Sequence, residues 1–241
     1  MDIGISGLDT PFRYFAADSF YYFTVARNMA ETGIVSFDQN YPTNGFHPIW
    51  QAFLALQYKI FLLLGLSEPV YLIIVLLISV FFVSLGILLI GIAMSQCGRQ
   101  LPSFFLVLPV GVYALLLLPF WVYLINIRGF ANRCGGPLPL FGTMWSFMNG
   151  MESGLALFVF GILALVFVLR KRIPMFSPPI MGFLASMLAL SRLDHIFISG
   201  SFFLFYLLAV VFHRTRKSLN EFLLFTTCLA IPLLIYMIIN Y

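Results

Sequence analysis

The run VYLIIVLLISVFFVSLGILLIGIAM, residues 70–94, decides the fold class of this chain, because no aspartate, glutamate, lysine or arginine interrupts it. A helix needs about 20 apolar residues to cross a bilayer, so the run predicts a transmembrane helix. The composition of the whole chain agrees, since 61% of its 241 residues are hydrophobic and only 9% are charged. A soluble domain has about 25% charged residues. We therefore expect an all-α polytopic membrane protein.

Further apolar runs bring the expected number of transmembrane helices to about six. They lie at residues 102–125, 154–169, 176–190, 196–212 and 222–239. Basic residues follow alternate runs, at Arg99, at residues 170–172 and at residues 214–217. Short cytoplasmic loops are enriched in lysine and arginine, so we place these turns inside the cell. Residues 1–68 then form an extracytoplasmic loop with juxtamembrane amphipathic helices, and residues 69–241 form the transmembrane bundle.

The segment at residues 47–66 leaves two topologies open. It is apolar and near spanning length, but Gln51, Gln57 and Lys59 interrupt it. If it crosses the membrane, the N-terminal loop is cytoplasmic; if it lies in the interface, the loop is extracytoplasmic. We favour the interfacial placement, which gathers polar residues of several loops on one side of the membrane: Asp18, His47, Glu152, Arg192 and Asp194.

Asp18 is the first candidate for chemistry. It precedes residues 19–32, whose apolar side chains recur at helical spacing, so it stands where a helix N-cap would stand, and Gly33 stands where that helix would end. Alternatively, aromatic neighbours such as Tyr21 and Tyr22 would partly desolvate the carboxylate and suit it to act as a general base. A cap can serve both purposes, and the pattern does not choose between them.

The motif Pro42-Thr-Asn-Gly-Phe-His-Pro48 predicts a turn that leads into a helix, with Pro48 at the first helical position. On a functional interpretation, Asn44 and His47 would donate hydrogen bonds to a phosphate or a sugar at this helix start, where backbone N–H groups already attract anions. A single histidine is more often structural, so the motif alone is a weak signal.

Two further polar motifs flank apolar runs. Asn149 and Glu152 have the spacing of a capping box, or Glu152 directs a carboxylate into a polar cavity. Arg192 and Asp194 form a tight hairpin with the arginine stem along apolar surface, or Arg192 neutralises a phosphate leaving group through its guanidinium. Lys59 is one of several basic residues that compete for the phosphate.

These motifs follow one another in a recognisable order. They are Asp18-Ser-Phe-Tyr-Tyr, Ala26-Arg-Asn, Phe37-Asp38, Pro42-Thr-Asn-Gly-Phe-His-Pro48-Ile-Trp50, Asn149-Gly-Met-Glu152-Ser-Gly-Leu and Ser191-Arg-Leu-Asp194. Together they resemble the first extracytoplasmic loop and later blocks of C-type (GT-C) integral-membrane glycosyltransferases. The likeness is closest to the bacterial branch related to protein O-mannosyltransferases and lipid A aminoarabinose transferases.

The resemblance implies transfer of a sugar from a polyprenyl-phosphate donor to a hydroxyl of a lipid, glycan or protein, on the outer face of the plasma (inner) membrane. Asp18 would deprotonate the acceptor hydroxyl. His47, Asn44, Arg192 and Lys59 would bind the donor phosphate. The substrate cavity would include these further side chains: Glu152, Asp194, Tyr21 and Tyr22. Membrane lipids are expected partners and nucleic acid is not.

The chain departs from the family pattern at two places. The family loop commonly begins with two adjacent acids, whereas Ala17 stands beside Asp18 here, so a divalent metal that needs both acids is in doubt and no cofactor is assigned. Cys97, Cys134 and Cys228 have no metal-ligand spacing. Family members also have a span before this loop and continue beyond this length, so we expect a fragment or a truncated member with an incomplete GT-C core.

Two other classes of function are kept as alternatives. A transporter or lipid flippase should place ionisable or helix-breaking features near the centres of its spans. Here the acids lie at span ends, which favours the transferase, although Pro109, Pro119 and Pro232 interrupt apolar runs. The other alternative is a non-catalytic scaffold that descends from such an enzyme.

Overall fold

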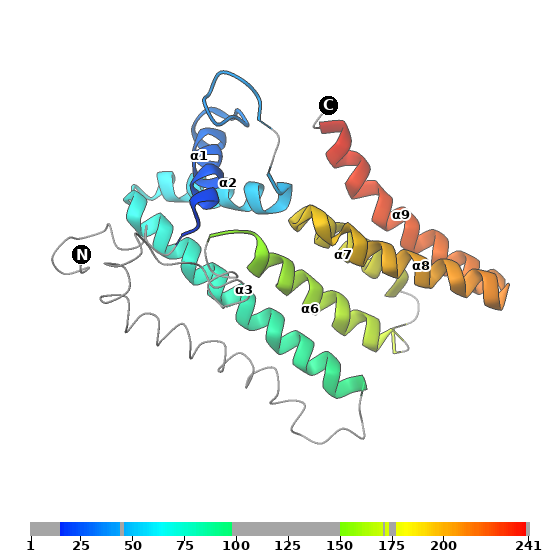
Figure 1. The fold of residues 1–241 in the computed structure, drawn as a ribbon. Coiled ribbons are helices and arrows are strands. Elements are labelled where there is room, and N and C mark those ends of the chain that lie inside the picture. Colours follow the sequence, from blue (N-terminus) through cyan, green and yellow to red (C-terminus); the bar gives the residue numbers. More distant parts are fainter. Residues whose placement is uncertain (1–14, 44–45, 98–149, 171, 174–176, 240–241) are drawn as a thin grey trace, which may run out of the picture.

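The computed structural model describes residues 15–43, 46–97, 150–170, 172–173 and 177–239, and these residues form helices and their connections without a strand (Figure 1). The elements are α1 (Ala17–Thr32), α2 (Pro48–Leu63), α3 (Glu68–Cys97), α6 (Ser153–Leu169), α7 (Ser177–Ser191), η3 (Leu193–His195), α8 (Ile196–His213) and α9 (Arg216–Ile239). The expected all-α class is confirmed for this part of the chain.

Within the described residues, three helices are long and apolar enough to cross a membrane. They are Glu68–Gln96, Leu193–His213 and Arg216–Ile239. The apolar helices α6 and α7 are shorter, at 17 and 15 residues. The run expected at 102–125 lies outside the described residues. The structure thus supports a membrane protein, and the number of six spans stays a prediction.

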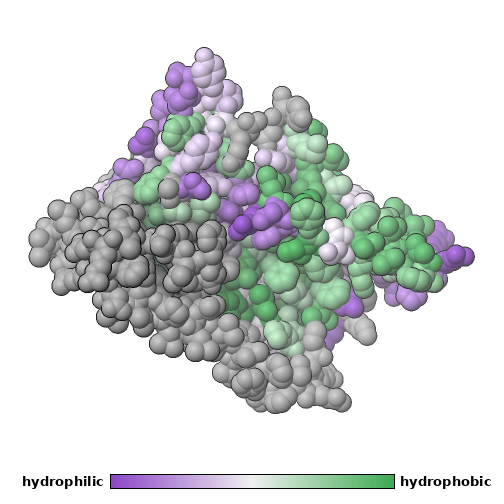
Figure 2. Space-filling model, in the orientation of Figure 1, coloured by the Kyte–Doolittle hydropathy of each residue, from purple (hydrophilic) through white to green (hydrophobic). Residues whose placement is uncertain are grey.

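The hydrophobic surface supports the same conclusion (Figure 2). Hydrophobic side chains cover most of the visible face of α7, α8 and α9, whereas hydrophilic side chains gather beyond α1 and at the far tip of the α8–α9 hairpin. Phe197 and Phe212, near opposite ends of α8, are 81% and 76% exposed. Such large apolar side chains are rarely left bare in water, so these helices suit a lipid environment.

Two pairs of helices pack so closely that only glycine fits between them. A side chain on Gly86 of α3 would place its Cβ 2.9 Å from the backbone of Leu157 in α6, and a Cβ on Gly161 of α6 would lie 2.8 Å from the carbonyl oxygen of Gly86. Gly182 of α7 likewise packs against the carbonyl of Phe225 in α9. Small residues let helix backbones approach in membranes, where packing rather than the hydrophobic effect holds helices together.

The helices α1 and α2 lie across one end of this bundle (Figure 1). The side chain of Gln51 in α2 donates to the backbone carbonyl of Tyr22 in α1, and Lys59 donates to the carbonyl of Ala30 at 2.8 Å. Among the described helices, α2 is not one of the candidate spans. Its position suits the interfacial helix expected from the sequence, while the side of the membrane on which it lies stays a prediction.

Two expected helix caps are wrong. The helix α1 begins one residue before Asp18, with Ala16 at the N-cap and no side-chain capping bond, so Asp18 lies exposed in the first turn. Glu152 is itself the N-cap residue of α6 and makes no capping bond, and Asn149 lies outside the described residues. The reason is Gly150, whose positive φ of 84° breaks the helical backbone that a capping box would need.

Two other boundary predictions are confirmed. Pro48 is the first residue of α2, where its missing N–H costs nothing. Gly33 follows α1 with a φ of 77°, and its N–H bonds to the carbonyl of Met29. A left-handed residue at this position is a common helix end, and glycine adopts it without strain.

The loop after α1 is held by its own polar side chains. Asn28 donates to the carbonyls of Ser36 and Phe37. Asp38 accepts hydrogen bonds from the backbone N–H groups of Tyr41 and Asn40, and these bonds keep the pKa of its carboxyl below the ordinary value. These bonds fix the loop against α1, and the loop leads directly into the segment that contains His47.

Candidate functional site

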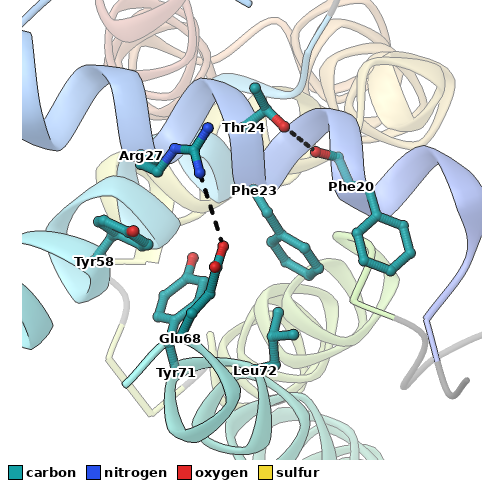
Figure 3. Close-up of a pocket in the computed structure, with 8 residues that line it drawn as sticks. All are labelled: Phe20, Phe23, Thr24, Arg27, Tyr58, Glu68, Tyr71 and Leu72. Atoms are coloured by element: carbon teal, nitrogen blue, oxygen red, sulfur yellow. Dashed lines mark hydrogen bonds and ion pairs between the residues drawn. The ribbon is translucent and has the colours of Figure 1, made fainter. Parts of the chain in front are cut away.

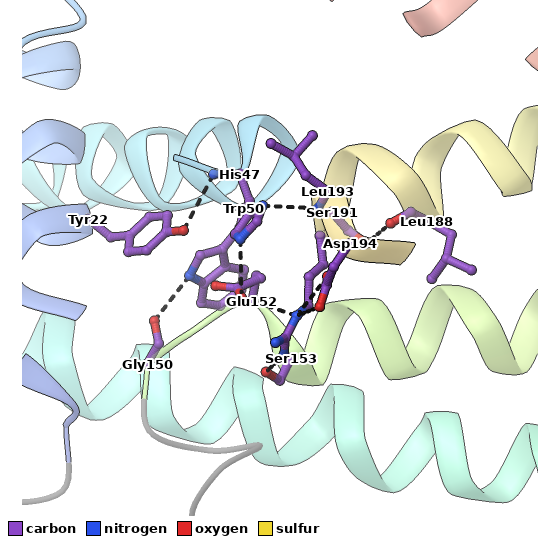
Figure 4. Close-up of polar contacts among 11 residues, drawn as sticks. Tyr22, His47, Trp50, Gly150, Glu152, Ser153, Leu188, Ser191, Leu193 and Asp194 are labelled. Atoms are coloured by element: carbon purple, nitrogen blue, oxygen red, sulfur yellow. Dashed lines mark hydrogen bonds and ion pairs between the residues drawn. The ribbon is translucent and has the colours of Figure 1, made fainter. Parts of the chain in front are cut away.

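Polar side chains from distant segments meet where α6 begins and α7 ends (Figure 4). His47 directly precedes α2, Glu152 directly precedes α6, and Arg192 and Asp194 lie between α7 and α8. Tyr22 reaches them from α1. We call these five residues the polar cluster. Four of them are helix-end residues, so the way the helices pack decides that they meet.

His47 joins three segments of the chain. Its Nε2 lies 3.4 Å from Oε1 of Glu152, and the backbone N–H of Leu193, 146 positions away, donates to its Nδ1 at 3.2 Å. A backbone N–H can only donate, so Nδ1 carries no proton and the single proton of a neutral ring lies on Nε2, facing the carboxylate. Both ring nitrogens are engaged in this state.

Glu152 is the buried centre of the polar cluster, with 3% of its surface exposed. Its Oε1 faces His47 and lies 3.9 Å from Nε of Arg192, whereas its Oε2 is buried without a hydrogen-bond partner among the described residues. An unpaired buried acceptor costs about 1–3 kcal/mol. A bound group that donates a hydrogen bond to Oε2 would remove that cost.

Arg192 is held from two sides. Its Nε donates to both carboxylate oxygens of Asp194, at 3.0 and 3.1 Å, and its Nη1 donates to Oγ of Ser153 at 3.0 Å. The side chain of Asp194 is 58% exposed and that of Arg192 is 38% exposed, so their pair lies at the rim, unlike Glu152.

Tyr22 forms a wall of the polar cluster. Its ring stacks on the His47 ring with centroids 6.4 Å apart, and its hydroxyl accepts a hydrogen bond from the backbone N–H of His47 at 3.4 Å. Burial raises the pKa of its phenol well above the ordinary value, and the charge of Glu152 raises it further. Tyr22 therefore keeps its proton at neutral pH and can donate it in a hydrogen bond.

Trp50 and Gly150 stand in the motifs quoted above without a role of their own, and in the structure they join α2 to the segment that leads to Glu152. Trp50 is 1% exposed, and its Nε1 donates to the carbonyl of Gly150 at 3.0 Å. Gly150 has a positive φ, and a side chain there would collide with Phe15. The contact links α2 to the start of α6. No local pattern pairs Trp50 with a glycine a hundred positions away, so the sequence carried no usable signal.

The remaining predicted residues lie elsewhere. Asp18 is exposed, forms no ion pair with the basic residues that the structure describes, and stands one helical turn before Tyr22 on the same face of α1. Tyr21 turns to the loop, where its hydroxyl bonds to Thr43 and its ring stacks on Phe37. Lys59 lies about 18 Å along α2 from His47 and caps α1 instead. Asn44 is outside the described residues.

Outside the polar cluster, a hollow lies between α1, α2 and α3 (Figure 3). Its volume is about 60 Å³, and its lining includes Arg27 and Glu68, which lie 4.0 Å apart, and the rings of Tyr58 and Tyr71. A cavity of about 10–15 Å³ by this measure already holds one water molecule, so the hollow has room for several waters. In the described part of the chain, no three histidine, cysteine, aspartate or glutamate side chains are grouped to hold a metal ion.

Comparison of the chain with protein families, with curated proteins and with solved structures finds no match. Membership of the GT-C family stays a prediction.

Replacing Glu152 with glutamine tests whether the buried charge or the shape matters. Glutamine fits the same space and its carbonyl can still accept from His47, so we expect a folded protein whose midpoint of thermal unfolding in detergent changes by a few degrees at most. Any activity of the polar cluster should weaken, because Arg192 loses a facing charge. An unfolded Glu152→Gln product would show that the carboxylate is mainly structural.

Because the pKa of Tyr22 is raised in the folded protein, we expect its contribution to the free energy of unfolding to fall at alkaline pH. A group whose pKa is higher in the folded state contributes stability that is complete below its unfolded pKa, about 10 for tyrosine, and is lost as pH rises above it. The free energy of unfolding of the wild type should therefore exceed that of Tyr22→Phe by a margin that narrows between pH 9 and pH 11. The other tyrosines are common to both proteins. A constant margin would contradict the burial of this hydroxyl.

Proposed function

We propose that the chain is a glycosyltransferase, or part of one, that uses a polyprenyl-phosphate-linked sugar at the extracytoplasmic face of a membrane. The observation that carries the proposal is the polar cluster itself. The resemblance assigns motifs of the first loop and of two later loops to one active site. His47, Glu152 and Arg192, one from each of these motifs, are in contact although His47 is more than a hundred positions from the other two.

The distribution of charge supports the proposed sidedness. The helix α6 starts at the polar cluster and ends at Leu169, directly before Arg170, and its 17 residues span about 25 Å, close to the hydrocarbon core of a bilayer. The helix α8 also starts beside the cluster and ends at His213, before the basic turn of residues 214–217. Basic turns favour the cytoplasm, so the polar cluster belongs on the opposite face.

The proposed reaction uses these groups in definite roles. Asp18 takes the proton of the acceptor hydroxyl while the oxygen of that hydroxyl forms a bond to the anomeric carbon of the sugar. The bond from that carbon to the phosphate oxygen breaks, and polyprenyl phosphate leaves with the electron pair. Arg192 offsets the charge that grows on the phosphate. A hydroxyl of the sugar donates to the free Oε2 of Glu152.

Release of polyprenyl phosphate is the direct test, because it does not require the acceptor to be known. The purified protein in liposomes would be given a panel of polyprenyl-phosphate-linked hexoses together with membrane extract as the acceptor source, and free polyprenyl phosphate would be measured by mass spectrometry. Release that depends on the protein is expected for at least one donor. No release from any donor would reject the transferase, and movement of the intact donor between leaflets would identify a flippase.

The sidedness has its own test in intact cells. After replacement of Cys97, Cys134 and Cys228, a cysteine is placed at Asn40, which is exposed in the loop after α1, or at Lys217, which is exposed in the first turn of α9. A membrane-impermeant thiol reagent should label Asn40→Cys from outside and Lys217→Cys only after lysis. The reverse pattern would contradict an extracytoplasmic site.

A further inference from the structure

The polar cluster carries more negative than positive charge. Arg192 faces two carboxylates, those of Glu152 and Asp194, while the hydrogen bonds of His47 fit a neutral ring. A phosphate that entered this arrangement would meet a net negative charge, which opposes its binding. For the site to bind an anion, one of the two carboxylates must move away from Arg192.

The two carboxylates differ in how easily they can move. Glu152 is 3% exposed and lies at the start of α6, enclosed by His47 and Arg192. Asp194 is at the rim on the short helix η3, with a side chain that is 58% exposed. Exposed ion pairs contribute about 0–1 kcal/mol, so Asp194 can leave Arg192 at little cost. Glu152 cannot leave at little cost, because its carboxylate is buried.

The guanidinium keeps its position when Asp194 leaves. Its Nη1 is held by the hydroxyl of Ser153, so Nε remains directed toward the place that the Asp194 oxygens occupy. A phosphate offers oxygens of the same charge and spacing, and charge-assisted bonds from arginine to phosphate are stronger than neutral hydrogen bonds. The place of the Asp194 carboxylate is thus suited to a phosphate.

We propose that Asp194 is an internal counterion of Arg192, displaced by the phosphate of the lipid-linked donor when the donor binds. The inference rests on the proposed function of the same cluster. It assigns Asp194 a positioning role: it holds Arg192 in place while the site is empty, and its departure couples donor binding to a change at the rim.

The test measures binding of undecaprenyl phosphate to the purified protein in detergent, with undecaprenol as the uncharged reference and inorganic phosphate as a second probe. Undecaprenyl phosphate should bind Asp194→Asn about fivefold more tightly than it binds the wild type, because the variant lacks the competing charge. Asp194→Glu keeps the charge and should bind like the wild type. Glu31→Gln, which changes an exposed acid in the last turn of α1, outside the polar cluster, should also bind like the wild type. Undecaprenol should bind all of them equally.

The outcomes separate the inference from the proposed function. If the wild type prefers undecaprenyl phosphate to undecaprenol and Arg192→Gln loses that preference, the phosphate site is present. Unchanged or weaker binding by a folded Asp194→Asn would then overturn the counterion role alone. If the wild type shows no such preference, or Arg192→Gln keeps it, the phosphate site and the proposed role of Arg192 fail together. Equal tightening for inorganic phosphate would show that the site selects the phosphate without the prenyl chain.

Discussion

Replacing Asp18 with asparagine is expected to lower the release of polyprenyl phosphate at least about a hundredfold, because asparagine has the same shape but cannot accept a proton at neutral pH. General acid–base catalysis commonly contributes a factor of 10²–10⁴. The change should leave the fold intact. Asp18 is exposed in the first turn of α1, caps nothing and forms no ion pair with a described basic residue, so only its small interaction with the helix dipole is lost.

Glu31→Gln is the matched control for Asp18→Asn. Glu31 is also exposed on α1, but it lies in the last turn, far from the polar cluster. The Glu31→Gln variant should release polyprenyl phosphate at the wild-type rate. Both variants should insert into the membrane and unfold as the wild type does. Wild-type release by Asp18→Asn would remove this residue from the mechanism and leave Glu152 as the carboxylate to test next.

The largest expected effect on stability comes from Gly86→Leu. A Cβ at this position would lie 2.9 Å from the backbone of Leu157, and a backbone cannot move aside as a flexible side chain can. Overpacking of this kind costs about 1–3 kcal/mol or more, and here it would push α3 and α6 apart. Because α6 begins next to Glu152, the variant should also lose the contacts of the polar cluster.

A graded series makes the test of the α3–α6 contact specific. Gly86→Ala, which adds the Cβ alone, should lower the midpoint of thermal unfolding in detergent by less than Gly86→Leu. Gly200→Leu makes the larger substitution on α8, at a glycine whose Cβ would meet no atom within 4 Å, and it should be tolerated. Equal stability of Gly86→Leu and Gly200→Leu would show that α3 and α6 do not approach as closely as described.

Local patterns predicted the helices well, because their causes are local. Apolar runs without charges indicate helices that are stable in lipid, and the structure places helices at every expected run within the described residues. Pro48 and Gly33 marked a helix start and a helix end, since the backbone requirements of these residue types are local too. The cap expected at Asp18 failed because α1 begins one residue earlier, and the capping box expected of Asn149 and Glu152 failed because Gly150 between them has a positive φ.

The candidate site was only partly predictable. Tyr21 and Tyr22 were both assigned to the substrate cavity, but successive residues of a helix point about 100° apart, so one packed in the polar cluster and the other against the loop. The charge of Lys59 suggested a phosphate ligand, but because α2 packs on α1, its amine donates to the carbonyl of Ala30 near the end of α1. Charge and residue type do not say which neighbour a side chain will reach.

The sequence by itself determined that this chain is a helical membrane protein and which residue types stand at the ends of its helices, because hydrophobic runs and turn residues act over a few positions. The tertiary structure alone decided which of those ends meet. It brought the N–H of Leu193 to His47, Trp50 to Gly150, and Arg192 to the buried carboxylate of Glu152. These contacts follow from how whole helices pack against one another, which aligns ends that lie far apart in the chain, and no local pattern records that alignment.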